Sequence, residues 1–256
     1  MLLRKIAIWG YFSLHSLASF IPYMLDYRRF QKNRQSLTDT RFKVGLSELY
    51  PCLNDNTALT PFDAHYIYHP AWAARILSKT KPEEHVDISS SLSFVSLVSS
   101  FIKVRFYDYR PAKLNLTNLS CDAADIVSLP FSNNSIPSLS CMHVVEHIGL
   151  GRYGDPINSK ADLLAVTELK RVVEKGGDLL FVVPVGGVAK IMYNAHRIYT
   201  YDLVMEMFSG FKLMDFSLVS DAEQHVNEFI SPASKEDAKN CTYGCGCFWF
   251  KKLDGE

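Results

Sequence analysis

Two imidazoles and a carboxylate stand close together in the segment Cys141-Met142-His143-Val144-Val145-Glu146-His147. A histidine exchanges protons near neutral pH, so His143 or His147 could act as a general base. Glu146 could orient either imidazole. The loop that follows contains Gly149, Gly151 and Gly154, which permit unusual backbone angles. Glu146 and His147 could instead cap and order this loop, and both interpretations stay open.

A second polar group follows later in the chain and comprises Asn194, His196, Arg197 and Tyr199. The guanidinium of Arg197 could bind an anionic group through two hydrogen bonds. His196 is an alternative base. We therefore take Asn194, Arg197 and Tyr199 as candidate substrate-binding residues. One aromatic run could form a lid over a site or simply pack in the core: His65, Tyr66, His69 and Trp72.

Acidic residues stand at the ends of the first two strand-like segments of the central region. Asp87 belongs to the first and is followed by the serines 89–91, and Asp108 ends the second. A carboxylate at this position can accept hydrogen bonds from both hydroxyls of a ribose, and Asp108 fits that role. The alternative for Asp108 is a pair with Arg110 in a surface turn. The alternative for the serines is a polar helix cap.

Strand and helix patterns alternate along the chain. Strands are expected at 86–89, 104–108, 119–124, 138–144, 178–183, 211–219 and 243–251, and helices at 70–78, 92–102, 161–173 and 201–208, with Pro70 in the first turn of its helix. This alternation predicts an α/β fold with a mostly parallel sheet and helices on both faces. Ligands of such sheets bind outside the carboxyl ends of the strands. We expect residues 1–60 to form an N-terminal helix and irregular extension, and residues 61–256 to form the domain.

Three further segments resemble class I S-adenosylmethionine-dependent methyltransferases. The segment Ala124-Asp125-Ile126-Val127-Ser128-Leu129-Pro130-Phe131 resembles their adenine-contacting segment, 144–147 the segment after their fourth strand, and 168–177 the helix before their fifth. The resemblance implies a Rossmann-like sheet of seven strands, with the last antiparallel and 86–89 in a central position. It also implies that S-adenosylmethionine is the cofactor and that it is held by Asp87, Ser89, Ser90, Asp108, Asp125 and Ile126.

The first turn departs from the methyltransferase pattern, because serines stand where glycines are expected. We expect Ser89 and Ser90 to avoid positive φ angles, since a Cβ atom there would strain the approach of a cofactor. This departure favours a chain that has kept the fold and lost the chemistry.

More closely, the chain resembles a family known only as a domain of unknown function, described from nematodes and also found in bacteria. The resemblance runs from about residue 50 and rests on Phe62-Asp63-Ala64-His65-Tyr66, His69-Pro70-Ala71-Trp72, Asp87-Ile88-Ser89-Ser90, the segment 147–155 and Tyr243-Gly244-Cys245-Gly246-Cys247-Phe248-Trp249. The serine turn belongs to that family's pattern. No activity comes with the family, although in bacteria it often accompanies surface-polysaccharide genes.

Charge and cysteine content narrow the range of partners. Lys plus Arg and Asp plus Glu both number 27, so there is no basic excess to attract nucleic acid. Cys121 and Cys141 lie in apolar, strand-like runs, which suits a reducing cytosol. The spacing of Cys241, Cys245 and Cys247 matches no usual zinc pattern, and the last two would point the same way from a strand. We therefore predict no metal site.

Residues 6–25 carry no formal charge and lie between Arg4-Lys5 and Arg28-Arg29. A membrane-spanning helix needs ~20 strongly apolar residues, and this segment is diluted by Gly10, Pro22 and several serines. Three interpretations stay open: a helix packed on the domain, an interfacial helix and a span. We expect a cytoplasmic protein, with peripheral membrane contact through residues 6–25 as the alternative.

Together these patterns predict a methyltransferase-like enzyme that uses S-adenosylmethionine on a small molecule. Because the family often accompanies surface-polysaccharide genes in bacteria, a sugar or glycan intermediate is the suggested acceptor. The alternative is a methyltransferase fold without catalysis that acts as a binding or assembly module, with membrane association left open. Asp108, Asp125 and the stretch 143–147 favour the enzyme, and the serine turn favours the module.

Overall fold

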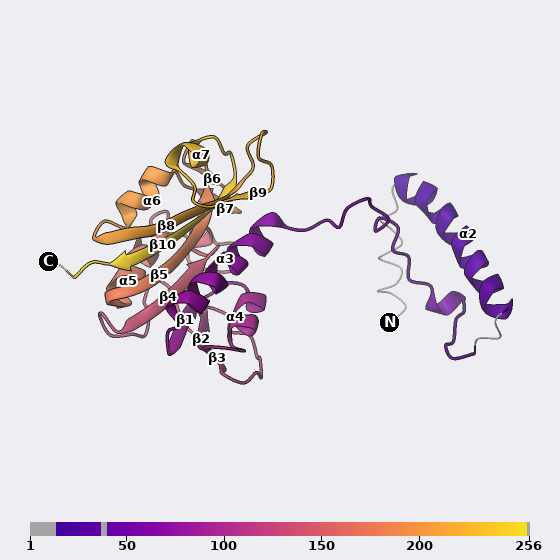
Figure 1. Cartoon of the computed structure of the whole chain (residues 1–256), viewed down its shortest axis with the longest axis horizontal. Coiled ribbons are helices and arrows are strands. Elements are labelled where there is room, and N and C mark those ends of the chain that lie inside the picture. The colour runs from indigo at the N-terminus through magenta and orange to yellow at the C-terminus, as the bar shows by residue number, and fades with distance from the viewer. Residues whose placement is uncertain (1–13, 37–39, 255–256) are drawn as a thin grey trace. The chain divides into compact units, whose positions relative to one another are not determined.

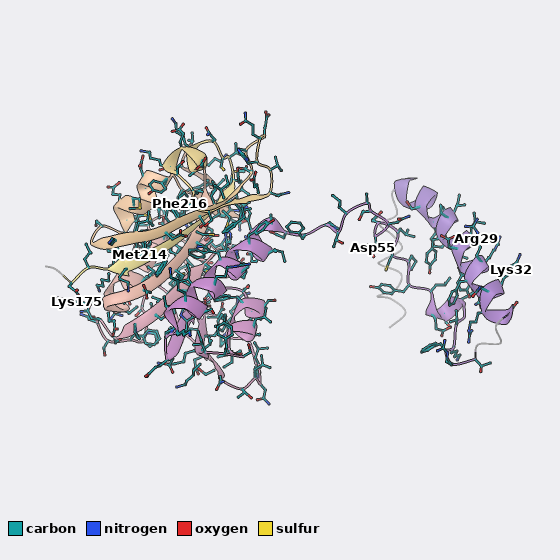
Figure 2. All side chains as sticks on the ribbon, in the orientation of Figure 1. Arg29, Lys32, Asp55, Lys175, Met214 and Phe216 are labelled. Carbon is teal, nitrogen blue, oxygen red and sulfur yellow. The ribbon has the colours of Figure 1, made fainter. Side chains whose placement is uncertain are left out.

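A computed structural model describes residues 14–36 and 40–254, and the chain divides into two compact units, Met1–Phe62 and Asp63–Glu256. The N-terminal unit contains helix α2 (Leu14–Ser36) and the short 3-10 helix η1 (Leu46–Glu48). Helix α2 carries exposed charged side chains, among them Arg29 and Lys32 (Figure 2). The remaining elements all belong to the second unit.

The uncharged segment 6–25 falls only partly within the described residues. Residues 6–13 lie outside them, and residues 14–25 form the first half of α2, which contains Pro22. Among the helices of the described part, none combines the length and the apolar character needed to cross a membrane.

The second unit is built on an eight-stranded sheet with the order β3-β2-β1-β4-β5-β10-β8-β9 (Figure 1). The strands are β1 (Glu84–Ile88), β2 (Lys103–Asp108), β3 (Leu119–Ala123), β4 (Ile136–Met142), β5 (Val173–Val185), β8 (Phe211–Ser220), β9 (Glu228–Ile230) and β10 (Gly244–Lys252). Strands β1 to β5 pair in parallel, and β10 is antiparallel to both β5 and β8. The seven expected strands are present with the last one antiparallel, and β9 adds a short edge strand.

Helices cover both faces of this sheet, as the alternation of elements predicted. Helices α3 (Ala64–Thr80) and α4 (Leu92–Val98) lie on one face, and α5 (Ala161–Val172), α6 (Tyr201–Met207) and α7 (Lys235–Lys239) lie on the other (Figure 1). Each face has its own apolar core. Cys245 and Cys247 both belong to the core under α3 and α4, because alternate residues of a strand face the same way.

Strand β1 is central, between β2 and β4. Four of its five residues are buried, and β5 is buried almost without interruption from Leu179 to Val185. Such continuous burial is what a parallel strand covered on both faces requires. The central position predicted for 86–89 is therefore confirmed, and the carboxyl ends of β1, β2 and β4 meet at one edge.

Helix α3 begins earlier than the sequence pattern predicts. Its N-cap is Asp63, whose side chain accepts a hydrogen bond from the backbone N–H of Tyr66 at 3.2 Å, so Pro70 lies inside the helix and not in its first turn. The prediction of a start at Pro70 is wrong, because Asp63 caps the helix well before Pro70. This earlier start places the side chains of the first two turns beside the carboxyl ends of the strands.

A small hairpin of β6 (Lys190–Met192) and β7 (His196–Ile198) follows β5 and was not predicted. Both strands are short and lack a clear alternation of apolar residues. The hairpin places His196 beside the 3-10 helix η2 (Val145–His147). The ring centroids of His196 and His147 lie 6.3 Å apart.

Candidate functional site

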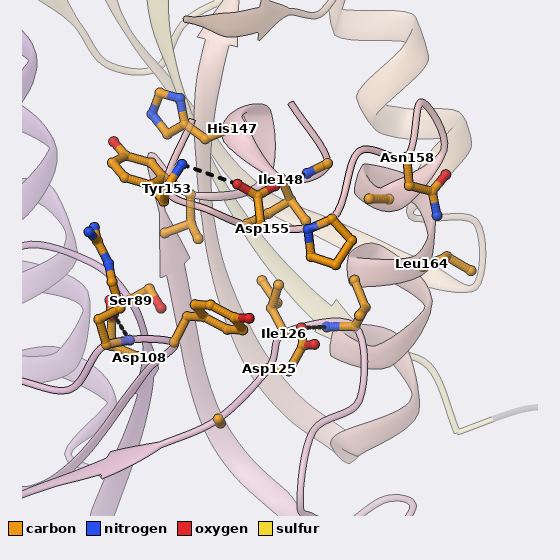
Figure 3. Close-up of a pocket in the computed structure, with 18 of the residues that line it drawn as sticks. Ser89, Asp108, Asp125, Ile126, His147, Ile148, Tyr153, Asp155, Asn158 and Leu164 are labelled. Carbon is orange, nitrogen blue, oxygen red and sulfur yellow. Dashed lines mark hydrogen bonds between the residues drawn. The ribbon is translucent and has the colours of Figure 1, made fainter. Parts of the chain in front are cut away.

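A cavity of about 300 Å³ opens at the carboxyl ends of β1 to β4 (Figure 3). This volume is at the lower end of the range of small-molecule sites. The cavity is lined by residues that follow four different strands: Ser89 after β1; Asp108, Tyr109 and Arg110 after β2; Ala124, Asp125, Ile126 and Val127 after β3; His143, Val144, His147, Ile148, Gly149, Tyr153, Asp155, Pro156 and Asn158 after β4; and Ala161 and Leu164 of α5. Ligands of parallel α/β sheets bind at this position, outside the carboxyl ends of the strands.

Asp108 and Asp125 supply carboxylates to the same cavity (Figure 3). One oxygen of Asp108 accepts the backbone N–H of Arg110 at 2.7 Å, and one oxygen of Asp125 accepts that of Val127 at 3.1 Å. These turns fix the two side chains and leave each carboxylate a second oxygen for a ligand. Asp122, the neighbouring acid in the sequence, is exposed on β3 and is not among the lining residues.

Ser89 adopts a φ of 57°, in the left-handed region that favours glycine. Its backbone N–H donates to the carbonyl of Tyr107 at 2.7 Å, and its hydroxyl donates to the same oxygen at 3.2 Å. The expectation that Ser89 avoids positive φ is therefore wrong, because these two hydrogen bonds to β2 hold the turn. The turn has the conformation of a glycine turn and keeps a serine side chain on the wall of the cavity.

Asp87 and Ser90 are buried and are not among the lining residues. One oxygen of Asp87 accepts the backbone N–H of Ser90 at 2.9 Å, and the other accepts the hydroxyl of Ser140. The hydroxyl of Ser90 accepts the N–H of Met142 at 3.0 Å. Burial raises the pKa of Asp87 to about 6. Both residues thus tie β1 to β4 beneath the cavity.

The loop after η2, which belongs to the family-like segment 147–155, forms another wall of the cavity. Asp155 accepts the backbone N–H of Gly149 at 2.6 Å and that of Tyr153 at 3.2 Å. Burial raises the pKa of Asp155, but the hydrogen bonds from backbone N–H groups lower it by more, so the net shift of the pKa is downward. Gly149 has a φ of 77°, and a Cβ there would lie 2.1 Å from the carbonyl oxygen of Asn158. The loop therefore requires glycine at this position.

Arg110 and Tyr153 join two walls of the cavity. The guanidinium carbon of Arg110 lies 4.9 Å from the ring centroid of Tyr153, which is a cation–π distance. Arg152 lies over the same ring at 5.1 Å. The sequence offered Arg110 only as a partner of Asp108, because its contact with Tyr153 joins segments that follow two different strands.

His147 lies at the rim of the cavity with one ring nitrogen fixed (Figure 3). Its Nδ1–H donates to the carbonyl oxygen of Ala195 at 2.6 Å, which leaves the lone pair on Nε2. Nε2 lies 3.8 Å from Oε1 of Glu146. Burial lowers the pKa of His147, so its imidazole is neutral at physiological pH and able to accept a proton.

His143 and Glu146 form a buried pair beside the cavity. Nδ1 of His143 lies 2.8 Å from Oε1 of Glu146, and their side chains are 4% and 1% exposed. Burial lowers the pKa of His143 to about 4 and raises that of Glu146 to about 7. His143, which has a φ of 56°, is the only one of the two that lines the cavity. Glu146 thus contacts both imidazoles from behind.

The second polar group is not part of the cavity lining. Arg197 is buried and donates to the carbonyl oxygen of Ile148 at 2.7 Å, with its Nε 3.6 Å from Asp162. The hydroxyl of Tyr199 donates to the same carboxylate of Asp162 at 3.1 Å. These side chains hold the loop after β4 onto α5 from its inner side. Asn194 is exposed.

The aromatic residues of α3 surround His143 from the other side. The ring centroids of His65, Tyr66 and His69 lie 5.3, 5.6 and 5.1 Å from that of His143. Burial is the main cause that lowers the pKa of His65 to about 4 and that of His69 to about 3. Trp72 instead packs in the core and donates to Asp215 at 3.0 Å.

Comparison with known proteins identifies the fold and leaves the activity open. Residues 132–243 match the model of a family described as "Caenorhabditis protein of unknown function, DUF268". No curated protein matches the chain. A 1,6-didemethyltoxoflavin-N1-methyltransferase from Burkholderia thailandensis, solved with its substrate and S-adenosylhomocysteine, is similar over 73% of this chain and 79% of its own, with 11% identity and a TM-score of 0.50. A candidate sarcosine dimethylglycine methyltransferase from Galdieria sulphuraria is similar over 73% of this chain and 85% of its own, with 13% identity and a TM-score of 0.50. The chain therefore has the class I methyltransferase fold.

Proposed function

We propose that this chain, with its class I methyltransferase fold, binds S-adenosylmethionine in the cavity and transfers the methyl group to a small molecule. The observation that carries the proposal is the convergence of Asp108, Asp125 and His147 on one cavity, although the three residues follow three different strands. A chain that had kept only the fold would have no need to hold two carboxylates and a neutral imidazole around an open space.

The lining of the cavity fits the parts of this cofactor. The free oxygen of Asp108 would accept hydrogen bonds from the ribose hydroxyls, and the carboxylate of Asp125 with the backbone of Ile126 would bind the adenine edge. Apolar side chains of Ile126, Val144 and Ile148 complete the walls. When bound, the cofactor supplies a methyl group attached to a positively charged sulfur.

His147 is the base in this proposal. Its Nε2 carries a lone pair at the rim of the cavity, and its Nδ1–H is committed to Ala195. A base held in one tautomer can take the proton of an acceptor hydroxyl or amine as the methyl group is transferred. The ring centroid of His196 lies 6.3 Å from that of His147, and His196 is outside the cavity lining.

A small acceptor with hydroxyl groups, such as a sugar or glycan intermediate, suits this base. Alcohols do not ionise near neutral pH, so their methylation gains from a neutral imidazole that accepts the proton. The balance of 27 basic and 27 acidic residues supports a small-molecule partner over nucleic acid.

A non-catalytic binding module is the second candidate, and the conformation of Ser89 favours it. The turn after β1 has the φ angle of a glycine turn, yet it places a Cβ and a hydroxyl on the cavity wall. These atoms narrow the approach to the backbone, which is where the glycines of methyltransferases leave room. Under this alternative the cavity binds a ligand and no methyl group moves.

A transfer experiment separates the two. The full chain would be incubated with S-adenosylmethionine labelled in its methyl group and with separate pools of sugars, amines and carboxylic acids. The enzyme is supported if label enters one pool in a manner that His147→Ala abolishes. Binding of the cofactor without transfer to any pool would replace the enzyme with the binding module.

A further inference from the structure

The buried histidines between α3 and β4 include polar atoms that nothing in the catalytic proposal uses. Among the residues that the structure describes, Nε2 of His143 and Nε2 of His69 are fully buried and have no hydrogen-bond partner. Both rings are oriented through Nδ1: that of His143 by Glu146 at 2.8 Å, and that of His69 by the carbonyl of His65 at 2.7 Å. A buried lone pair without a donor is unusual and calls for a ligand or an ion.

Three ligand atoms converge at the lone pair of His143. One ring nitrogen of His65, one of His143 and the Sγ of Cys245 all lie within 4.8 Å of one another. They come from three separate elements: the first turn of α3, the end of β4 and the start of β10. Because Nδ1 of His143 is committed to Glu146, we take its unpaired Nε2 as the ligand atom.

We propose that His65, His143 and Cys245 bind a divalent transition-metal ion, with zinc the ion that suits them best. Two imidazoles and a thiolate form a borderline-soft ligand set, which zinc accepts in tetrahedral geometry. In such a site the ligand atoms lie roughly 3.3–3.8 Å apart, given metal–ligand distances of about 2.0–2.3 Å. Because the three atoms lie within 4.8 Å of one another, the side chains would close by roughly 1–1.5 Å at most around the ion.

The surroundings also suit a cation. Glu146 holds His143 in the tautomer that presents Nε2, the arrangement in which a carboxylate orients a metal-binding histidine. The carboxylates of Asp63 and Asp221 both act electrostatically on His65. Cys245 is fully buried in the core under α3, where a thiol paired with a metal would be shielded from oxidation.

A set of three protein ligands leaves the fourth tetrahedral position open to water or a substrate atom. The ion would lie beside the cavity, because His143 lines the cavity while its Nε2 is buried. Sequence reasoning excluded a metal from the spacing of the cysteines alone, since His65 and His143 are brought to Cys245 only by the fold. The metal proposal does not depend on methyl transfer.

The test uses the metal alone. The purified full chain is freed of metal with a chelator and titrated with zinc by calorimetry and with Co²⁺ by absorption spectroscopy. We expect one ion per chain and, with Co²⁺, the charge-transfer absorption of a thiolate ligand. Cys245→Ala and His65→Gln should each weaken binding by more than the roughly 10- to 100-fold expected of Glu146→Gln, which removes only the orienting carboxylate.

Cys247→Ala is the matched control, because Cys247 is equally buried on the same face of β10 with its Sγ 3.9 Å from that of Cys245. It should keep both the affinity and the thiolate band. If Cys245→Ala does not fold, as judged by circular dichroism, His65→Gln carries the test, since His65 lies in the partly exposed first turn of α3. Absence of saturable binding to the wild-type chain, or an equal loss in Cys247→Ala, would overturn the proposal.

Discussion

His147 and the carbonyl of Ala195, 48 residues apart in sequence, are joined by a hydrogen bond of 2.6 Å to Nδ1 of the imidazole. Arg152 donates to the same oxygen at 3.0 Å. The bond fixes the tautomer of His147, whose Nε2 lies 3.8 Å from Oε1 of Glu146. The turn of the β6–β7 hairpin, which carries Ala195, therefore positions the side chain of His147.

His147→Ala should lower kcat by about 10²- to 10⁴-fold, because it removes the base while the groups that bind the cofactor remain. Cofactor affinity should stay nearly unchanged. His196→Ala is the matched control, since His196 lies outside the cavity lining. The measurement is transfer of a labelled methyl group under saturating cofactor. Equal losses in both variants would remove His147 from the role of base.

Asp108→Asn should weaken binding of the cofactor by ~1.5–3 kcal/mol, the scale of hydrogen bonds to a charged group. Asparagine keeps one oxygen for the N–H of Arg110, so the turn after β2 is preserved better than it would be by alanine. Asp122→Asn serves as the control, because its side chain is exposed on the neighbouring strand. Calorimetric affinities that are the same for both variants would contradict the ribose assignment.

The sequence was sufficient for the alternation of strands and helices and for the carboxylate of Asp108, which ends an apolar strand. The central position of 86–89, the antiparallel last strand and the role of Asp125 came from the resemblance to methyltransferases. The sequence was insufficient for Asp87, because an acid at a strand end looks the same whether it faces a ligand or bonds to a neighbouring strand through Ser140. The inward role of Arg197 was equally invisible, since its partners Ile148 and Asp162 are brought to it by the fold.

The turn after β1 is strained, and glycine should relieve it. A left-handed φ costs an L-residue roughly 1–2 kcal/mol. Glycine avoids this cost, but the greater entropy of its unfolded chain lowers stability by about 0.4–1 kcal/mol. Ser89→Gly should therefore raise the free energy of unfolding by up to about 1 kcal/mol and tighten cofactor binding, because it clears the cavity wall.

Ser90→Gly is the contrasting variant for chemical denaturation. It leaves the buried N–H of Met142 without its acceptor, so it should destabilise the fold by about 1–3 kcal/mol. A Ser89→Gly chain that is as unstable as Ser90→Gly would show that the hydroxyl of Ser89 matters more than its backbone angle.

The buried imidazole of His85 should make the fold sensitive to acid. Burial lowers its pKa from 6.5 to about 3, and both ring nitrogens lie 2.8 Å from serine hydroxyls. The unfolded chain therefore binds a proton that the folded chain refuses, and stability is lost as the pH falls below about 6.5. Between about pH 7 and pH 5 this single group should cost about 2 kcal/mol.

His85→Gln should lose about 2 kcal/mol less than the wild-type chain over that interval in urea unfolding. The raised pKa of Asp87 has the opposite effect, because it removes stability as the pH increases toward about 6. This effect is present in both the wild-type chain and His85→Gln, so it cancels in the comparison. Parallel pH profiles for the two chains would contradict the burial of His85 as a neutral group.

The most direct measurement of cofactor binding is calorimetric titration of the full chain with S-adenosylmethionine and with S-adenosylhomocysteine. We expect saturable binding of both at one molecule per chain, weakened in Asp108→Asn and in Asp125→Asn and unchanged in Asp122→Asn, because only the first two carboxylates line the cavity. Absence of binding to the wild-type chain, or equal affinity in all three variants, would contradict the proposed cofactor site.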